Sequence, residues 1–178
     1  MTAREAVADH VALQDIWELG VTLGIVGPQP PGSVVIEIGS MYGGSLNAWA
    51  SLGALVIGVT LHPVAETHGA LMIYGDSHDA GIQEQLKAAL GGRDLSFGFI
   101  DGDHSEAGCQ ADFDLLLSLG AAVIGFHDIA CPVNPDVRLV WDRVKAGRRH
   151  AEIINPATPE IVNPGVVWPM GTGLVWLQ

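Results

Sequence analysis

The stretch FGFIDGDHSEAGCQADFDLLLSLGAAVIGFHDI, from Phe97 to Ile129, decides the fold that we predict. Two apolar runs, Leu95–Ile100 and Ala121–Phe126, flank a helix-patterned segment, and this order predicts a β-α-β unit with parallel strands. Acids and histidines follow both runs: Asp101, Asp103 and His104 after the first, and His127 and Asp128 after the second. Ligands bind at the carboxyl ends of the strands in an open α/β sheet, so we expect these side chains to meet at one edge.

Three carboxylates and two imidazoles at one edge suit a site for a hard metal ion and a general base. Simpler interpretations stand beside this one. His104 is either a catalytic base or a structural histidine bonded to a carboxylate, and Asp103 is expected to stabilise its turn. We expect Asp112 and Asp114 to face solvent and Cys109 to pack in the core, since no activating base stands beside this cysteine.

The composition bounds the class of protein. A chain of 178 residues is long enough for one domain with a real core. We predict a single domain over residues 1–178, with an N-terminal helical segment and loop over 1–32 and the α/β core over 33–178. The net charge of −12, with only eight Lys and Arg, disfavours binding to nucleic acid or to an anionic membrane.

Further patterns bear on the compartment. The two cysteines form no zinc or disulfide pattern, the N-terminus does not read as a signal peptide, and no apolar run approaches the roughly 18 residues of a membrane span. We therefore expect a cytoplasmic protein.

The remaining chain alternates strand and helix patterns. A helix is expected from Thr2 to about Leu23, although Gly20 is a possible break. Strands are expected at Val34–Ile38, Ala54–Thr60, Leu71–Tyr74 (an edge strand), His150–Ile154 and Gly173–Leu177, the last antiparallel to its neighbour. A short helix is expected at Ser45–Ser51. Another is expected after Asp79, with Ile82, Leu86 and Leu90 facing the core. A third is expected to bury the stripe Phe113, Leu116 and Leu117, and a fourth is expected to start at Asn134–Pro135 and to bury Val137, Val140, Trp141 and Val144.

A glycine-rich loop joins the first strand to the next helix. The segment Glu37 to Ser45 reads EIGSMYGGS, and its glycines let the backbone turn and let a ligand approach main-chain N–H groups. A strand, a glycine loop and a helix start form a cradle for a nucleotide or cofactor, although an ordinary tight turn has the same pattern. The spacing of Gly39 and Gly43 does not fit the GxGxxG motif of dinucleotide enzymes.

Four motifs together resemble a known family. They are EIGSMYGGS at Glu37–Ser45, YGDSHD at Tyr74–Asp79, FIDGDHS at Phe99–Ser105 and FHDI at Phe126–Ile129. The chain resembles class I S-adenosylmethionine (SAM)-dependent methyltransferases, in particular the metal-dependent branch with macrolide-sugar O-methyltransferases and cephalosporin-hydroxylase-like proteins. This resemblance implies a three-layer αβα, Rossmann-like doubly wound fold whose mostly parallel seven-stranded sheet has an antiparallel last strand.

The resemblance also implies roles for individual residues. The residues implied to bind the cofactor are Glu37, Gly39, Ser40, Tyr42, Gly43, Ser45, Thr60, Asp76, Ser77 and Asp101. The resemblance places a divalent ion, Mg²⁺ or Mn²⁺, on Asp101, His127 and Asp128, and makes His104 the general base. Two positions depart from the family: Thr60 replaces a ribose-binding acid, and His127 replaces a carboxylate in many relatives, so that it either ligates or orients.

The expected function is a SAM-dependent, metal-assisted O-methyltransferase that acts on a small hydroxylated metabolite or sugar. Trp168, in a proline-rich loop, is the tryptophan that we expect nearest to substrate, whereas Trp49, Trp141 and Trp176 are expected in the core. Two alternatives stay open. One is a non-catalytic protein that keeps the fold for binding or assembly, including assembly into a homo-oligomer, and the other is a metal-dependent hydrolase that needs no SAM.

Overall fold

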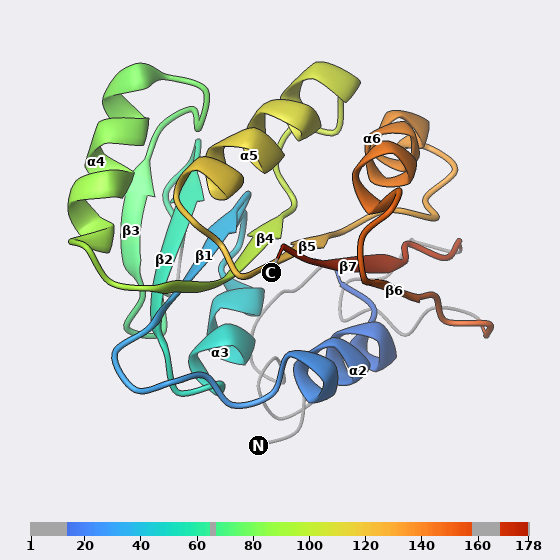
Figure 1. Cartoon of the computed structure of the whole chain (residues 1–178), viewed down its shortest axis with the longest axis horizontal. Coiled ribbons are helices and arrows are strands. Elements are labelled where there is room, and N and C mark those ends of the chain that lie inside the picture. The colour runs from blue at the N-terminus through green and yellow to red at the C-terminus, as the bar shows by residue number, and fades with distance from the viewer. Residues whose placement is uncertain (1–13, 65–66, 158–167, 178) are drawn as a thin grey trace.

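The described part of the chain forms one seven-stranded sheet with the strand order β3-β2-β1-β4-β5-β7-β6 (Figure 1). The structure is a computed structural model, and it describes residues 14–64, 67–157 and 168–177. The strands are β1 Val34–Ile38, β2 Leu55–Thr60, β3 Leu71–Tyr74, β4 Leu95–Ile100, β5 Val123–Phe126, β6 His150–Ile153 and β7 Thr172–Trp176. The helices are α2 Ile16–Val26, α3 Gly44–Ala50, α4 Ala80–Leu90, α5 Glu106–Ser118 and α6 Pro135–Lys145.

The sheet confirms the predicted topology. Strands β3, β2, β1, β4 and β5 pair in parallel, and β7 runs antiparallel to both β5 and β6. Helices α4, α5 and α6 cover one face, and α2 and α3 cover the other (Figure 1). The strand order reverses direction between β1 and β4, which is where open α/β sheets bind their ligands.

Two apolar cores fill the space between the layers. On one face, Leu86 of α4, Phe113 of α5 and Val140 of α6 pack with the sheet. On the other face, Leu19 of α2 and Trp49 of α3 pack against it. The central strand β1 is buried along its whole length, as its sequence, apolar except for Glu37, predicts for a strand covered on both sides.

Local signals explain most helix ends. Asp15 accepts a hydrogen bond from Glu18 N at the start of α2, and Ser105 accepts one from Gly108 N at the start of α5. Gly91 ends α4 in the left-handed region at φ 59°, and Pro135 occupies the first turn of α6. Asp79 stands at the predicted start of α4 but makes no side-chain capping bond.

The structure corrects some sequence expectations. The predicted helix from Thr2 falls partly on residues 1–13, which lie outside the described residues, and the described helix α2 passes through Gly20 without a break. In α5, Leu117 is 43% exposed rather than buried, while Asp112 is 0% exposed rather than solvated. The buried stripe of this helix therefore lies one position earlier than we predicted, because the helix turns Asp112 and Phe113 toward the sheet together.

Helix α2 also secures the chain near the sheet edge. The side chain of Glu18 is buried, and its two carboxylate oxygens accept hydrogen bonds from Asn155 N at 2.8 Å and Gly171 N at 3.0 Å. Burial raises the pKa of Glu18, and the bond from Asn155 opposes that rise. This carboxylate thus joins α2 to the chain just after β6 and just before β7.

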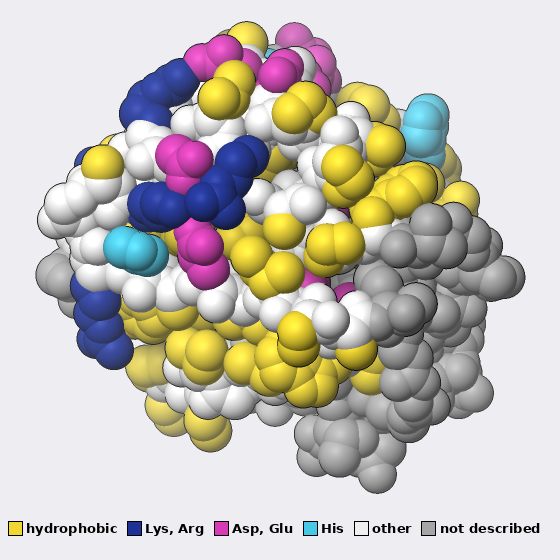
Figure 2. Space-filling model, turned by 90° about the vertical axis from the view of Figure 1, so that its right-hand side faces the viewer, with side chains coloured by type: hydrophobic (Ala, Val, Ile, Leu, Met, Phe, Trp, Pro, Cys, Tyr) yellow, Lys and Arg dark blue, Asp and Glu magenta, His cyan; other side chains and the backbone are white. Residues whose placement is uncertain are grey.

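Basic side chains on the face that carries α6 and β6 are paired with acids. Figure 2 shows Lys and Arg side chains interleaved with Asp and Glu there, and Arg138 and Lys145 each contact both Asp142 and Glu152. Among the described residues, no helix is long and apolar enough to cross a membrane.

Candidate active site

The end of β4 supplies the first half of the site. Asp101 follows the strand directly, and its N–H donates to Ile38 O at 2.8 Å, which ties it to the end of β1. Gly39 lies so close that a Cβ added to it would meet Asp101 O at 2.0 Å, and its φ of 95° also favours glycine. The chain then turns through Asp103, whose carboxylate accepts from Ser105 N at 2.8 Å, so this acid stabilises the turn as expected. His104 leaves this turn beside Asp101.

The end of β5 supplies the second half. His127 N donates to Ile100 O at 3.0 Å, which continues the parallel pairing of β5 with β4. Asp128 follows with φ 62°, in the left-handed region, where aspartate is among the few residues other than glycine that are tolerated. This sharp turn is closed by Cys131 N donating to Asp128 O at 3.1 Å, and it brings the carboxylate of Asp128 close to Asp101 and His104.

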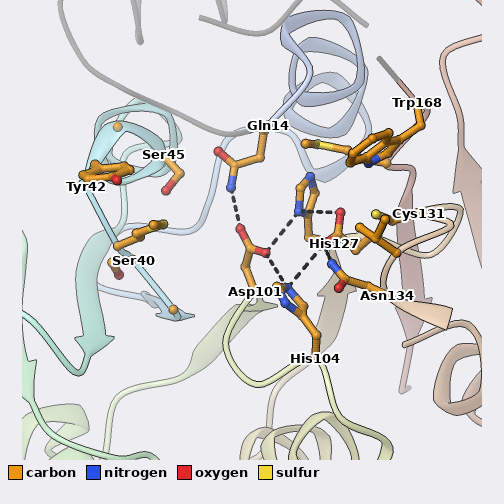
Figure 3. Close-up of a pocket in the computed structure, with 16 residues that line it drawn as sticks. Gln14, Ser40, Tyr42, Ser45, Asp101, His104, His127, Cys131, Asn134 and Trp168 are labelled. Atoms are coloured by element: carbon orange, nitrogen blue, oxygen red, sulfur yellow. Dashed lines mark hydrogen bonds and ion pairs between the residues drawn. The ribbon is translucent and has the colours of Figure 1, made fainter. Parts of the chain in front are cut away.

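The four side chains form one cluster, as the sequence predicts. His127 Nδ1 lies 3.0 Å from Asp101 Oδ1 and 3.4 Å from Asp128 Oδ1. His104 Nε2 lies 3.6 Å from Asp101 Oδ1 and 3.3 Å from Asp128 Oδ2. Each imidazole therefore stands between the same two carboxylates (Figure 3).

The charges in this cluster depend on one another. Burial opposes ionisation of Asp101, but the charge of His127, its hydrogen bond to Asp101 and the nearby His104 outweigh it and lower the pKa of Asp101 to about 2. Burial likewise favours neutral His127, but the two carboxylates outweigh it and raise its pKa to about 10. The contact with Asp101, 3.6 Å away, raises the pKa of His104 as well. Without a metal ion, an ionised Asp101 therefore lies beside a protonated His127 at neutral pH.

Two polar residues that sequence reasoning missed complete the cluster. Gln14 Nε2 donates to Asp101 Oδ2 at 2.7 Å, across 87 positions of sequence. Asn134, which we predicted as the cap of α6, makes no capping bond and instead donates from Nδ2 to Asp128 Oδ2 at 2.6 Å. Its place shortly after Asp128 is a sequence signal that could have indicated this contact, whereas nothing local marks Gln14.

The glycine loop forms the opposite wall of the same cavity. This cavity, of about 230 Å³, is lined by the loop residues Gly39, Ser40, Met41, Tyr42, Gly44 and Ser45, by all four cluster residues and Gln14, and by Cys131, Val133, Asn134, Trp168 and Met170. Gly43 begins α3 with φ 84°. Glu37 is not among the lining residues, because it is buried on β1, where its Oε1 accepts from Trp49 Nε1 at 2.8 Å. Glu37 thus binds α3, the helix that follows the glycine loop, and does not face the cavity.

The other residues predicted to bind the cofactor lie farther along the sheet edge. Thr60 ends β2 and is nearly buried, Asp76 is exposed after β3, and Ser77 is nearly buried beside it. None of the three is among the described residues that line the cavity. Ser77 Oγ donates to Asp112 Oδ1 at 2.7 Å, and His78 Nε2 lies 3.3 Å from the same oxygen.

Asp112, which we expected to face solvent, is buried beside Ser77. Burial raises its pKa to about 6, and the hydrogen bond from Ser77 opposes the rise. The helical spacing of Cys109, Asp112, Phe113 and Leu116 places this acid on the buried stripe of α5, so the sequence held a signal that we did not use.

The remaining candidates behave mostly as expected. Cys109 is buried, and burial raises the pKa of its thiol to about 12, which keeps it unreactive. Trp49 and Trp141 are fully buried in the core. Trp176 is only half-buried, with the Arg149 guanidinium 4.4 Å from its ring centre. Trp168 lines the cavity, on the side away from the glycine loop (Figure 3).

The donor set fits a divalent metal ion. Ligand atoms of Asp101, His104 and Asp128 all lie within 4.8 Å of one another. Asp128 Oδ1 is buried and accepts no hydrogen bond among the described residues, and its ion-pair contact with His127 Nδ1 is 3.4 Å long, which leaves an oxygen lone pair for a cation. His127 bonds to Asp101 with the nitrogen that faces the cluster, and this contact suits orientation of a ligand. The two carboxylates suit either Mg²⁺ or Mn²⁺, whereas a histidine nitrogen as a third ligand would favour Mn²⁺.

Solved structures with a similar fold bear on the class of protein. The C-terminal domain of precorrin-6Y C5,15-methyltransferase from Rhodobacter capsulatus matches with a TM-score of 0.61 and 16% identity, over 98% of this chain and 94% of that chain. The Mtq2–Trm112 complex of E. cuniculi, responsible for methylation of the eRF1 translation termination factor, matches with a TM-score of 0.56 and 11% identity, over 92% and 95%.

A third structure was determined with ligands. The MycE methyltransferase of the mycinamycin biosynthetic pathway, in complex with Mg, SAH and mycinamycin VI, matches with a TM-score of 0.54 and 17% identity. The match covers 82% of this chain and 44% of MycE, so the chain spans less than half of that protein. No protein-family model and no curated protein sequence matches the chain.

These structures share one architecture with the sheet described above. The chain has the fold of SAM-dependent methyltransferases. At these identities the likeness concerns the fold, and the chemistry must be argued from the residues of this chain.

Proposed function

We propose that this protein is a SAM-dependent O-methyltransferase that uses a divalent metal ion and acts on a small hydroxylated acceptor. The observation that carries the proposal is that one cavity is lined both by the glycine loop and by the cluster of Asp101, His104, His127 and Asp128. A methyl donor held on the loop and an acceptor oxygen held at the cluster would lie side by side there. Methyl transfer depends on such alignment of the two reactants.

The residues on each side have distinct roles in this proposal. Gly39, Ser40, Tyr42, Ser45 and Asp101 would hold the part of the cofactor that enters the cavity. Thr60, Asp76 and Ser77 would hold the rest along the edge of the sheet. Thr60 offers one hydroxyl where a carboxylate would accept bonds from both ribose hydroxyls, so we expect weaker cofactor binding than with an acid at this position.

The cluster would hold the metal ion and prepare the acceptor. Asp101 and Asp128 supply the carboxylates, and His127 orients Asp101 through its 3.0 Å contact. When bound, a divalent cation lowers the pKa of an acceptor hydroxyl and fixes its position. Gln14 and Asn134 hold the outer oxygens of the two carboxylates, which limits their motion.

His104 is suited to take the proton of the acceptor hydroxyl. It is more exposed than the other three cluster residues, so its ring can reach a substrate in the cavity. A base must be neutral, and the hydrogen bond and negative charge of Asp101 favour the protonated form. His104 becomes available as a base once the charge of Asp101 and Asp128 is balanced by a cation.

The first experiment is a calorimetric titration of SAH into the purified protein with Mn²⁺, with Mg²⁺ and with a chelator. We expect binding in the micromolar range in all three conditions, because the glycine loop does not use the metal. Methyl transfer to an acceptor should then require the metal. No binding of SAH in any condition would reject the methyltransferase proposal.

A metal-dependent hydrolase is the second candidate. One observation favours it: the cavity contains the whole cluster but reaches only the glycine-loop part of the predicted cofactor site. This alternative expects Mn²⁺ binding without SAH binding, and hydrolysis of an ester or amide in the absence of SAM. The same titration therefore separates the two candidates.

A further inference from the structure

The loop between β3 and α4 is held by a helix that comes later in the chain. This loop, residues 75–79, includes Asp76 and Ser77, which under the proposed function hold part of the cofactor. Asp112 of α5 contacts two of its residues: Ser77 Oγ donates to Asp112 Oδ1 at 2.7 Å, and His78 Nε2 lies 3.3 Å from the same oxygen. Asp112 thus ties the loop to the helix beside α4 on the same face of the sheet (Figure 1).

Other contacts of the loop set the course of its main chain. Gly75 N donates to Thr60 O at 2.9 Å, and Asp79 N donates to Asp76 O at 3.0 Å. The carbonyl oxygen of Ser77 accepts a hydrogen bond from Gln83 Nε2 at 3.1 Å. Among the described residues, the hydroxyl of Ser77 bonds to Asp112 alone. The direction of this side chain therefore depends on Asp112.

The stability of the fold does not account for this carboxylate. Asp112 is 0% exposed, burial raises its pKa to about 6, and its Oδ2 is buried without a hydrogen bond among the described residues. Above pH 6 the ionised group therefore opposes folding, and an uncharged side chain of the same shape would favour it. What the carboxylate supplies is a strong acceptor for the Ser77 hydroxyl and a partner for the His78 imidazole.

The order of the strands gives this loop its place in the cofactor site. The glycine loop after β1 lines the cavity together with the cluster, so the reacting end of SAM would lie there. Thr60 ends β2, at the position where a ribose-binding acid is expected, and β3 is the next strand in the sheet. The adenine base, which is joined to the ribose, would therefore lie against residues 75–79.

We propose that Asp112 is a positioning residue for the cofactor, which holds Ser77 and His78 so that the loop after β3 can bind the adenosine end of SAM. Asp112 acts through these two residues, since its own side chain is withdrawn from the surface. This inference rests on the proposed function, and it adds a residue of α5 to a site that is otherwise built from the ends of strands.

The experiment measures the Kd of SAH and of 5′-methylthioadenosine at pH 8 by calorimetry. The second ligand has the adenosine end but lacks the amino-acid end. Asp112→Leu keeps the branched shape and removes the acceptor, so both ligands should bind about tenfold more weakly or worse, as expected when a hydrogen bond to a charged group is lost. Asp112→Asn keeps one acceptor oxygen and should bind both ligands within about threefold of the wild type.

Two controls separate positioning from a general loss of structure. Phe113→Leu changes the next residue of α5, which stacks on Phe126 of β5 with 5.8 Å between the ring centres. It should lower the midpoint of urea unfolding and leave the Kd of both ligands unchanged. The Kd of Mn²⁺ should be unchanged in Asp112→Leu, because Asp101 and Asp128 keep their contacts with Gln14 and Asn134.

A second variant tests the same contact from the loop. The side chain of His78 is 31% exposed, so His78→Ala should fold even if Asp112→Leu does not. It removes one of the two contacts with Asp112 and should weaken SAH binding by about threefold in the wild type. In the Asp112→Leu background it should have no further effect, because both substitutions break the same contact.

The outcomes separate this inference from the proposed function. Wild-type affinity for SAH in Asp112→Leu, or in His78→Ala if the first variant does not fold, would overturn the inference and leave the methyltransferase proposal standing. Equal losses of SAH and Mn²⁺ affinity in Asp112→Leu would overturn it as well, and so would equally weak SAH binding by Asp112→Asn. Failure of the wild type to bind SAH would reject the proposed function itself, and the inference with it.

Discussion

Asp101 and Asp112 are both largely withdrawn from solvent, yet their pKa values move in opposite directions. Asp101 lies between two imidazoles, and its pKa falls to about 2 despite the burial. Asp112 faces one hydroxyl and a more distant imidazole, and burial raises its pKa to about 6. Burial alone therefore does not decide whether a carboxylate is ionised. The number and charge of the groups that face it decide this.

This difference in pKa decides which carboxylate is available to a cation. Asp101 stays ionised at mildly acidic pH, whereas Asp112 does not. At neutral pH Asp101 is ready to ligate without first losing a proton, since its pKa lies well below 7. Asp112 binds a proton as the pH falls toward 6, and its main described partner is the Ser77 hydroxyl. The variants below test this contrast, in order of decreasing expected effect.

Asp101→Asn should have the largest effect. It removes a proposed metal ligand, so Mn²⁺ affinity should fall by more than the roughly 10- to 100-fold that loss of a supporting residue costs. Methyl transfer should be lost with it. Asp103→Asn is the matched control, because Asp103 stabilises the adjacent turn and is not among the described residues that line the cavity. Calorimetric titration with Mn²⁺ measures both, and an equal loss of affinity in the two variants would contradict the assignment.

The effect of Asp101→Asn on the unfolding free energy, measured with a chelator present, should depend on pH. The stability from Asp101 is present above its ordinary pKa of 3.8 and is lost as the pH falls toward about 2. The stability from His127 is present below 6.5 and is lost as the pH rises toward about 10. The difference in unfolding free energy between wild type and Asp101→Asn should therefore be largest between pH 3.8 and 6.5. A difference that is independent of pH would refute this account.

His104→Gln should reduce methyl transfer by about 10²- to 10⁴-fold, the usual contribution of a general base. Mn²⁺ affinity should change by less than about tenfold, because Asp101 and Asp128 remain. Rates at saturating Mn²⁺ and a separate metal titration distinguish the two effects. Since His104 lies within ligand distance of the same group, a parallel collapse of metal affinity would show that it is a ligand rather than a base.

Asp112→Asn should stabilise the protein at pH 8. Folding raises the pKa of Asp112 from 3.8 to about 6, so the ionised carboxylate costs up to about 3 kcal/mol of unfolding free energy above pH 6. This cost shrinks as the pH falls from about 6 toward 3.8, and the advantage of the variant should shrink with it. Urea unfolding at pH 8 and pH 4.5 measures the change. A variant that is less stable at pH 8 would show that the carboxylate is needed.

Ser77→Ala should have the smallest effect, a loss of about 1 to 2 kcal/mol of unfolding free energy at pH 8, because it removes one hydrogen bond to a charged group. The loss should be smaller in an Asp112→Asn background, where the acceptor is neutral. A double-mutant cycle gives this coupling. Equal losses in both backgrounds would mean that Ser77 acts through another contact.

The cluster could be predicted from the sequence because its four residues directly follow two neighbouring parallel strands. Apolar runs mark the strands, and the strand ends lie at one edge by topology, so proximity follows from the order of elements. The same logic located β1, the glycine loop and the edge strand β3, whose predicted bounds agree with the structure.

The contacts of three residues were not predicted from the sequence. The contact of Gln14 with Asp101 joins segments 87 residues apart, and no local pattern reports it. Asn134 occupies the predicted N-cap position of α6, but its side chain makes no capping bond and its amide bonds to the carboxylate of Asp128 instead. Asp112 was taken as solvated because charged residues seldom occupy a core, although its helical position pointed inward.

Glu18 holds the main chain on both sides of the segment between Asn155 and Gly171 with one carboxylate. Helix α2 thus fixes where the chain leaves β6 and where it enters β7. The last two strands of the sheet are coupled in this way to a helix that precedes the whole sheet in the sequence, so an early part of the described chain contributes to the stability of its last part.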